Sequence, residues 1–451
     1  MGRSRAKLSG EAVTALVDAL NHDGWGVVRA GAQGKTTFVA GALPGEVVEY
    51  RVRKRERGHD EAELLRVVTA SPERIEPHCA HYGICGGCSL QHLAPAAQLR
   101  VKDDMLRETL RRVGKVEPQQ WLSPLSGAPW GYRRRARLGA RFVHAKARSL
   151  VGFREKMSSY VADVRSCPVL AAPVGDMVGA LSELVTGLSI PTRIPQIEMA
   201  VGEGATVLVL RVLSPLTESD RHKLREFEQR HGVRWLLQSG RPDQLEALEG
   251  DAPSLWYTLP EYDLRLEFLP ADFIQVNGAM NRLLISHVLA QLQLDAGSRV
   301  LDLFCGLGNF TLPMARLAGD VVGVEGDVGL IDRARRNASA NGISNVRFEA
   351  GNLAGAEAQE RCLALAGTRP FTHVLIDPPR TGAVDVLPAL AALSPRRLVY
   401  VSCHPGSLAR DLGILVAQHG FSLCAAGIVD MFPHTSHVES VAVLDGPGSR
   451  G

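Results

Sequence analysis

Three short stretches in the last third of the chain contain side chains that could bind a cofactor and react with a substrate. They are residues 301–310 (LDLFCGLGNF), 376–380 (IDPPR) and 401–405 (VSCHP), and each accompanies an apolar run typical of a buried parallel strand. In an open α/β sheet, ligands bind beyond the carboxyl ends of the strands. We therefore expect a cofactor loop, an acidic side chain and a thiol to meet in one crevice. That combination suggests group transfer through a covalent enzyme intermediate.

Cys403 is the candidate nucleophile, since it lies just past the apolar run 398–401. A ring carbon such as C5 of uracil is too weak a nucleophile to attack a methyl sulfonium, but addition of a thiolate at C6 turns the ring into an enolate. The reactive form is the thiolate, which His404 or a nearby strand-end dipole could favour. A lone cysteine is more often buried structure, and Cys305 is a rival nucleophile, although its place in the cofactor loop calls for a small side chain.

A proton must leave C5 before the thiol can depart, so a base is needed at the same edge of the sheet. Glu439 lies among apolar and small residues in the stretch 437–441 (HVESV), which suits a raised pKa. The alternative is that Glu439 is only a charged residue at a strand edge, with a structural role. His434 is the alternative base.

The stretch 301–310 has the form of a nucleoside-binding loop. Gly306 and Gly308 bend the chain where the backbone must pass close to a ligand. The next strand, residues 320–324, is followed by Glu325, an acid placed to accept hydrogen bonds from ribose hydroxyls. The loop lacks the full G-x-G-x-x-G spacing of dinucleotide binders and looks like an S-adenosylmethionine loop. Asn352 follows the third strand, where it either meets the adenine or serves as a turn residue.

The prolines after Asp377 stop a buried strand rigidly. Enzymes that methylate exocyclic amines often have an aromatic residue after two such prolines, to stack the target base. Arg380 occupies that place here, which argues against amine chemistry. Asp377 is therefore expected to grip the base edge or the cofactor.

A second group of cysteines could bind a metal centre. Cys79, Cys85 and Cys88 have C-x5-C-x2-C spacing, and Cys167 lies far along the chain before Pro168. Four thiolates fit either zinc or a 4Fe–4S cluster. Two close pairs are the usual zinc pattern, so three cysteines plus a distant Cys-Pro favour iron–sulfur. The C-x3-C-x2-C spacing of radical S-adenosylmethionine enzymes is absent.

The elements that must position these residues form a multidomain α/β protein. Short strands separated by glycine turns up to about residue 69 predict a small barrel of the oligonucleotide-binding type. Apolar spacing predicts an amphipathic helix over 97–113. An α+β region with a strand at 207–213 follows, and from residue 272 the pattern predicts a doubly wound parallel sheet. We predict domains at 1–70, 71–270 and 271–451.

Composition bounds the partners and the compartment. The chain has 451 residues, 45% hydrophobic and 22% charged, and a net charge of +3 that is too small to prove a nucleic-acid partner. Residues 133–156 contain nine Lys or Arg against one acid, which fits a solvated face or a phosphate-contacting surface. There is no run long enough to span a membrane and no secretory signal. We therefore expect a cytoplasmic protein with reduced cysteines.

Together these motifs resemble the RNA (uracil-5)-methyltransferase family, in its bacterial 23S rRNA branch, over almost the whole chain. The resemblance implies an N-terminal TRAM barrel, a central domain with a 4Fe–4S cluster held by Cys79, Cys85, Cys88 and Cys167, and a Rossmann-like S-adenosylmethionine-dependent catalytic domain. It implies Cys403 as nucleophile and Glu439 as base. Its S-adenosylmethionine contacts fall on Gln275, Phe304, Asn309, Glu325, Asn352 and Asp377. It also implies that the helix at about 94–122 packs with the catalytic domain.

The expected activity is methylation of C5 of one uridine in 23S rRNA, of the uracil(1939) type. The target base would be flipped out to reach Cys403, in a monomeric enzyme whose cluster is structural. No membrane and no stable protein partner are implied. Two alternatives stay open at this point. One is the same chemistry on tRNA, although the tRNA branch typically lacks barrel and cluster. The other is a non-catalytic iron–sulfur RNA-binding assembly factor, against which the pairing of Cys403 with Glu439 argues.

Overall fold

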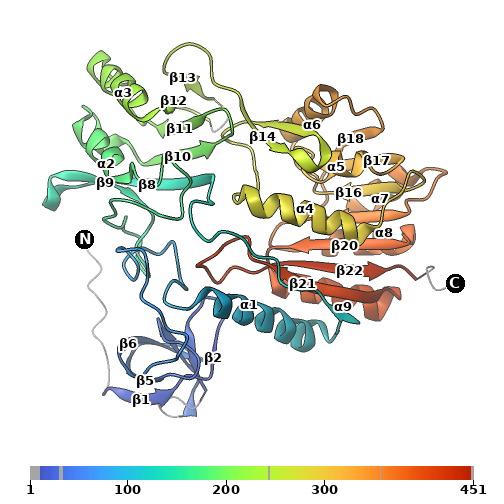
Figure 1. The fold of residues 1–451 in the computed structure, drawn as a ribbon, viewed down its shortest axis with the longest axis horizontal. Coiled ribbons are helices and arrows are strands. Elements are labelled where there is room, and N and C mark those ends of the chain that lie inside the picture. Colours follow the sequence, from blue (N-terminus) through green and yellow to red (C-terminus); the bar gives the residue numbers. More distant parts are fainter. Residues whose placement is uncertain (1–10, 30–33, 242–243, 356, 448–451) are drawn as a thin grey trace. The chain divides into compact units, whose positions relative to one another are not determined.

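The computed structural model describes residues 11–29, 34–241, 244–355 and 357–447 (Figure 1). The chain divides into two compact units. The first contains Met1–Met105, Arg154–Tyr160 and Phe432–His437, and the second contains Leu106–Phe153, Val161–Met431 and Val438–Gly451. The boundaries 1–70, 71–270 and 271–451 stay predictions.

The first unit begins with a six-stranded sheet, which confirms the predicted β-rich N-terminal region. Its strand order is β1-β5-β6-β4-β3-β2, in which β4 and β6 are parallel and the other pairs antiparallel. Alternating side chains of β5 are buried, so one face of the strand packs into a core around Val39, Val48 and Tyr50. The strands are β1 (Val13–Leu16), β2 (Ala19–Leu20), β3 (Gly26–Val28), β4 (Thr37–Ala40), β5 (Val47–Arg55) and β6 (Asp60–Thr69).

The cysteine segment, residues 79–88, consists of turns and isolated bridges, with no helix or strand between β6 and the next helix. That helix, α1 (Pro95–Thr109), continues into a π-helical turn, η2 (Leu110–Gly114). The predicted helix over 97–113 is thereby confirmed. Gly114 packs tightly on α9 (Pro405–His419) within the second unit, since a Cβ on Gly114 would lie 2.5 Å from the Ala409 carbonyl oxygen.

The second unit contains an α+β layer with the sheet order β13-β12-β11-β10-β8-β9. Its strand β11 (Thr206–Arg211) is buried along nearly its whole length, as the apolar run at 207–213 predicts. The other elements of this layer are β8 (Arg135–Val143), β9 (Arg148–Gly152), α2 (Val178–Gly187), β10 (Gln196–Val201), α3 (Glu218–His231), β12 (Arg234–Gln238) and β13 (Glu246–Ala247). The hairpin of β14 (Leu255–Leu259) and β15 (Leu264–Phe268) follows.

The largest sheet of the second unit has the order β18-β17-β16-β19-β20-β22-β21-β7. The five strands from β18 to β20 are parallel, as predicted, whereas β22 lies antiparallel to both β20 and β21. These strands are β7 (Gln120–Trp121), β16 (Arg299–Leu303), β17 (Asp320–Glu325), β18 (Val346–Ala350), β19 (His373–Ile376), β20 (Arg397–Ser402), β21 (Ser422–Val429) and β22 (Glu439–Asp445).

Helices pack on this sheet, with α6 on β17 and β18, and α4 and α9 on β20 (Figure 1). The central parallel strands β16, β19 and β20 are buried on both faces, which explains why they are continuous apolar runs in the sequence. The remaining helices are α4 (Gly278–Leu292), α5 (Thr311–Ala315), α6 (Val328–Ala340), α7 (Glu357–Ala366) and α8 (Leu387–Leu393). No helix among the described residues has the length and apolar character needed to cross a membrane.

Candidate active site

The carboxyl ends of the five parallel strands bring together most of the residues expected to do chemistry. Phe304 follows β16, Glu325 ends β17, and Asn352 lies two residues after β18. Asp377 follows β19 and Cys403 follows β20. Because these strands are neighbours in one parallel sheet, their carboxyl ends lie along a single edge.

Glu439 lies at the same edge although its strand, β22, is antiparallel to β20. It is the first residue of β22, and the antiparallel register pairs Ser440 with Ser402, next to Cys403. Its side chain is buried. Burial and the negative charge of Asp377 raise the pKa of Glu439 well above its usual range, while Arg380 opposes the shift. A carboxylate with a raised pKa is a stronger base, which suits proton abstraction.

Cys403 is half-buried, so a substrate can reach it. Burial, Glu439 and Asp377 together raise the pKa of its thiol to about 11, and Arg380 opposes them. His404 is the N-cap of α9, where its Nδ1 accepts a hydrogen bond of 3.1 Å from the backbone N–H of Ser407. That His404 favours the thiolate stays a prediction.

The glycine loop leaves room for a ligand. Gly306 has φ +57°, and a Cβ there would meet nothing within 4 Å. The carboxylate of Glu325 accepts hydrogen bonds from the backbone N–H groups of Gly306 (3.2 Å) and Asp327 (3.0 Å), which fix its orientation. A fixed carboxylate beside an open glycine backbone is the arrangement that binds the ribose of a nucleoside. The residues present therefore fit an adenosine-type cofactor.

Two more acids give the edge a negative character. Burial raises the pKa of Asp377 to about 7. Burial, with further contributions from Asp377 and Glu325, raises the pKa of Asp302 to about 8, although the Thr311 hydroxyl donates to its Oδ2 at 2.6 Å. Carboxyl groups with raised pKa values favour a positively charged ligand, because such a ligand stabilises their ionised forms. The charge of the edge thus fits a sulfonium or ammonium group.

Asn309 is held by residues that the sequence did not single out. Its Oδ1 accepts hydrogen bonds from the Tyr257 hydroxyl and from Asn281 Nδ2, both at 2.8 Å, and its Nδ2 donates to Asn281 Oδ1 at 2.9 Å. These contacts engage both ends of the amide. Tyr257 and Asn281 come from β14 and α4, and no local sequence signal links them to the glycine loop.

Two further predicted cofactor residues, Gln275 and Asn352, lie in loops. Gln275 lies on the loop before α4, and the backbone N–H of Arg134 donates to the carbonyl of Val276 at 2.8 Å, which holds that loop. Asn352 is exposed, and its Oδ1 accepts a hydrogen bond of 3.0 Å from the N–H of Ala354. Asn352 thus forms a turn contact through Oδ1, and its contact with the adenine stays a prediction.

Of the two rival catalytic residues, Cys305 is poorly placed for chemistry, and His434 as base stays a prediction. Cys305 is buried, and burial together with Asp302 raises the pKa of its thiol well above the usual range. His434 belongs to the first unit, where its ring lies 3.4 Å from the side-chain nitrogen of Gln98.

The four cysteines predicted to bind a cluster are divided between the units. Cys79, Cys85 and Cys88 belong to the first and Cys167 to the second. All four are half-buried and none of the eight cysteines forms a disulfide. The Gly87 N–H points at Cys85 Sγ (3.4 Å), a contact that suits a thiolate ligand. Within the described ranges, however, no three His, Cys, Asp or Glu side chains are gathered as they would be around a metal ion.

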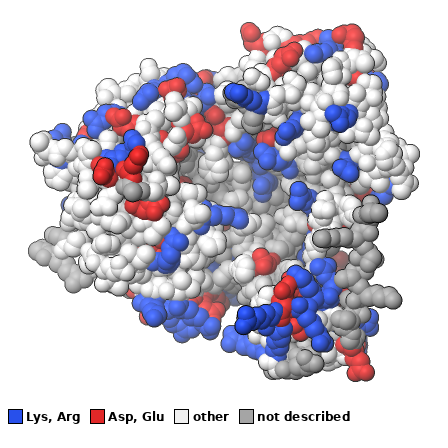
Figure 2. Space-filling view, turned by 180° about the vertical axis from the view of Figure 1, so that it is seen from behind, with Lys and Arg blue, Asp and Glu red and all other residues white. Residues whose placement is uncertain are grey.

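The arginine-rich stretch is only partly available to phosphates. Arg135 and Arg137 lie 3.9 and 3.1 Å from Glu198, while Lys146 and Arg148 both lie 2.6 Å from Asp163. Figure 2 shows Lys and Arg interspersed with Asp and Glu on one face of the molecule. The stretch 133–156 is therefore not a uniform basic surface.

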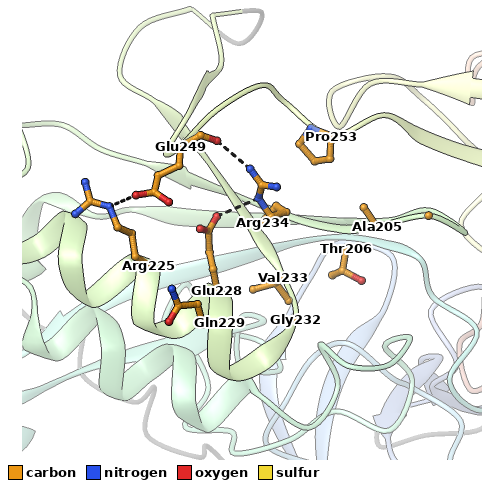
Figure 3. A pocket seen from close by; sticks show the side chains of 11 residues that line it. Ala205, Thr206, Arg225, Glu228, Gln229, Gly232, Val233, Arg234, Glu249 and Pro253 are labelled. Carbon is orange, nitrogen blue, oxygen red and sulfur yellow. Dashed lines mark hydrogen bonds and ion pairs between the residues drawn. The ribbon is translucent and has the colours of Figure 1, made fainter.

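A hollow of about 640 Å³ lies in the α+β layer, between α3, β12 and the segment around Pro253 (Figure 3). Its charged groups pair with one another. Arg225 Nε lies 2.5 Å from Glu249, and Arg234 lies 3.7 Å from Glu228 and donates to the carbonyl of Glu249. Since its charges are paired and the described residues that line it include no cysteine or histidine, this hollow is not a second candidate active site.

Comparison with known proteins gives three findings. A family model described as tRNA (Uracil-5-)-methyltransferase matches residues 254–446. A protein of Alkalilimnicola ehrlichii named 23S rRNA (uracil(1939)-C(5))-methyltransferase RlmD is 49% identical over 98% of this chain and 99% of its own. A protein of the same name from Xanthomonas campestris is 47% identical over 99% of this chain and 100% of its own.

Among solved structures, the tRNA (uracil-54, C5)-methyltransferase of Pyrococcus abyssi in complex with S-adenosyl-L-homocysteine is similar, with a TM-score of 0.70. It covers 96% of this chain and 100% of its own, at 23% identity. At that identity the likeness supports the shared fold, including the Rossmann-like domain.

Proposed function

This chain belongs to the RNA (uracil-5-)-methyltransferase family, and from that premise we propose that it transfers a methyl group from S-adenosyl-L-methionine to C5 of a uridine in 23S rRNA. The uridine is the one for which its relatives are named, uracil 1939. The observation that carries the proposal is near-full-length identity of 47–49% to those relatives. The meeting of Cys403 and Glu439 at one sheet edge supports it.

Cys403 supplies the nucleophile. Its thiolate adds to C6 of the uracil, forming a C–S bond and placing the displaced electron pair on the C4–C5 enolate. The bound cofactor supplies the methyl group that C5 then takes up. The half-buried position of Cys403 lets the ring approach.

Glu439 completes the reaction as base. It takes the proton from C5, the C5–H electron pair forms the C5–C6 double bond, and the C6–S pair returns to Cys403. Because its pKa is raised, Glu439 binds this proton more strongly than an ordinary carboxylate would. Arg380 lowers the pKa of both Cys403 and Glu439, so it keeps both groups within reach of their ionised forms.

The cofactor is proposed to contact six residues at the strand edge and the loops beside it: Gln275, Phe304, Asn309, Glu325, Asn352 and Asp377. The open space over Gly306 and the fixed carboxylate of Glu325 support this assignment. Asn309 is expected to act mainly through its backbone, since Tyr257 and Asn281 engage its side chain.

Cys79, Cys85, Cys88 and Cys167 are proposed to hold a 4Fe–4S cluster with a structural role. Four thiols of suitable chemistry and the N–H directed at Cys85 Sγ support it. Protein purified without oxygen should be brown and contain four irons and four sulfides per chain. Stoichiometric zinc in elemental analysis would instead show that the four cysteines form a zinc site, and would refute the cluster.

The N-terminal sheet is proposed to be a TRAM barrel that grips rRNA together with the exposed arginines, in a cytoplasmic, monomeric enzyme. tRNA is the second candidate substrate, because the family model is named for it. Methyl transfer to separated rRNA and tRNA pools decides between them. Methylation of tRNA alone would refute the rRNA assignment.

The central experiment traps the covalent intermediate. An rRNA fragment with 5-fluorouridine at the target should form a protein–RNA adduct that survives denaturation and maps to Cys403, since fluorine cannot leave as a proton does. Cys403→Ala should abolish adduct and methyl transfer while RNA binding persists. The matched control is Cys424→Ala, on strand β21 away from the strand ends that form the site. Turnover by Cys403→Ala would overturn the mechanism, as would an adduct at another residue.

A further inference from the structure

The segment Phe432–His437, which we call the anchor segment, belongs to a different unit from the residues on either side of it in the sequence. The strands on either side of it, β21 and β22, both belong to the second unit, whereas the anchor segment belongs to the first. The chain returns to the second unit at Val438, one residue before Glu439. The proposed base, Glu439, therefore comes just after a segment that belongs to the first unit.

The backbone of His434 is the centre of the attachment. Its N–H donates to Gln98 Oε1 at 2.9 Å, and its carbonyl accepts from the N–H groups of Ser89 and Leu90, both at 2.9 Å. His434 has φ +67°, a left-handed conformation that residues other than glycine adopt at an energetic cost. The three hydrogen bonds offset that cost, so they define the path of the chain.

Gln98 joins the anchor segment to the end of the cysteine segment. It is 2% exposed, and its Nε2 donates to the carbonyls of Leu90 (3.0 Å) and Leu93 (2.8 Å) while its Oε1 serves His434. One side chain thus ties together the loop that follows Cys88 and the loop that precedes Glu439. An amide is needed for this, because both donors and the acceptor are used.

Two further contacts hold alternate residues of the anchor segment. Ser89 Oγ accepts from the N–H of Ser436 at 2.9 Å. Lys102, which is fully buried, donates from Nζ to the carbonyl of Phe432 at 3.0 Å. Backbone groups at positions 432, 434 and 436 are therefore all fixed by residues 89–102. Ser89 follows Cys88 directly, so a displacement of the cysteine segment would also displace Ser89 and its hydrogen bond to Ser436.

We propose that Gln98, Ser89 and Lys102 are positioning residues for the base, acting through the anchor segment on Glu439. Glu439 opens β22, so the β-ladder holds the chain only on its carboxyl side, by pairing with Val429 and onward. The anchor segment holds the other side. Proton abstraction requires a carboxylate oxygen of Glu439 within about 3 Å of the C5 proton. A small displacement of Glu439 would therefore slow this step.

This inference rests on the proposed function. It predicts different effects on its two chemical steps, the addition of Cys403 with methyl uptake and the later removal of the C5 proton by Glu439. Cys403 is held by β20 and by the N-terminus of α9, both of which belong to the second unit. Loosening the anchor should therefore spare addition of Cys403 to C6 and methyl uptake at C5. It should slow the later step, in which Glu439 takes the C5 proton and the C6–S pair returns to Cys403. It also gives the cysteine segment a consequence for catalysis.

The test compares Gln98→Met with wild type and with Gln119→Met, a matched control at an exposed glutamine. Two rates are measured on the same rRNA fragment: tritium release from [5-³H]uridine, and adduct formation with 5-fluorouridine. We expect Gln98→Met to slow tritium release about tenfold or more and to accumulate a covalent complex with ordinary RNA. Its adduct rate with the fluorinated RNA should stay within about twofold of wild type. Gln119→Met should match wild type in both.

Equal slowing of both rates, or no slowing of tritium release, would overturn the proposal. Ser89→Ala, which removes only the contact to Ser436, supplies a milder variant if Gln98→Met does not fold, and it should shift the same ratio in the same direction. If wild-type protein formed no adduct with fluorinated RNA, the proposed function itself would fail. A wild-type adduct with an unchanged rate ratio in both variants would reject the anchor alone.

Discussion

At the level of single residues, Cys403 shares its surroundings with Glu439 and Asp377, and both acids oppose formation of its thiolate. With a pKa near 11, the ligand-free thiol is almost entirely protonated at neutral pH. The same acids favour a positive charge in the site. The nucleophile is therefore expected to be unreactive until a cationic ligand is bound, which would protect it from unwanted alkylation and oxidation.

Alkylation of Cys403 tests this expectation. Iodoacetamide should modify Cys403 slowly below pH 9 in the ligand-free protein, because little thiolate is present. Sinefungin carries an amine where the methyl donor has its sulfonium, so it should lower the apparent pKa of Cys403. S-adenosyl-L-homocysteine has a neutral thioether and nearly the same shape, so it controls for shielding. Mass spectrometry of the Cys403 peptide across pH gives both curves. Coincident curves for the two ligands would contradict the electrostatic account.

At the level of elements, the hydrogen bonds of Asn309 connect β14 and α4 to the glycine loop. Tyr257→Phe removes one donor to Asn309 Oδ1 and should weaken binding of S-adenosyl-L-homocysteine by about threefold to tenfold, as expected for one lost hydrogen bond. Titration calorimetry measures this. Tyr262→Phe is the matched control, since Tyr262 interacts with Ser286 rather than with the loop. Unchanged affinity in Tyr257→Phe would show that the loop keeps its shape without Tyr257.

The cysteine segment depends on a close backbone approach. The Gly86 N–H donates to the carbonyl of Arg154 at 2.8 Å, and a Cβ on Gly86 would lie 3.1 Å from that oxygen. Gly86→Ala should therefore displace the segment and lower the iron content of anaerobically purified protein by about half or more, given the tightness of such contacts. Gly58→Ala, where a Cβ meets nothing within 4 Å, should keep full iron content. Iron analysis of both proteins settles the question.

The parts of the site that topology alone determines could be predicted from the sequence. Parallel strands have a common carboxyl edge, so Asp377 and Cys403 could be brought together from their apolar runs. Tyr257 and Gln98 could not be found in this way, because each acts through a contact with a residue distant in sequence and lies in an ordinary apolar or helical pattern. The ring of His404 has a local role that its motif did not indicate, since it caps the helix that begins at Pro405.

At the level of the whole molecule, buried titratable groups determine how stability depends on pH. Burial lowers the pKa of His287 and His373, so their cost in the folded state grows as the pH falls below about 6.5. Asp377 and Asp302 act in the opposite direction. Their folded pKa values, about 7 and about 8, exceed the usual 3.8, so the folded state binds their protons more tightly than the unfolded state does. Their contribution is complete below about pH 3.8, declines as the pH rises above it, and is lost once the pH has passed 7 and 8.

The melting temperature of the ligand-free protein should therefore fall as the pH rises from 6.5 to 8. Asp302→Asn removes one of the two acids while its side-chain oxygen can still accept from Thr311. This variant should flatten the curve and gain about 4 kcal/mol over wild type at pH 8.5 relative to pH 5, since the contribution of Asp302 falls by about 1.4 kcal/mol per pH unit over the roughly three units up to its folded pKa of about 8. Asp295→Asn, whose pKa is lowered instead, should not flatten it. Calorimetric melts of the three proteins across pH test the account, and a wild-type melting temperature that rises from pH 6.5 to 8 would refute it.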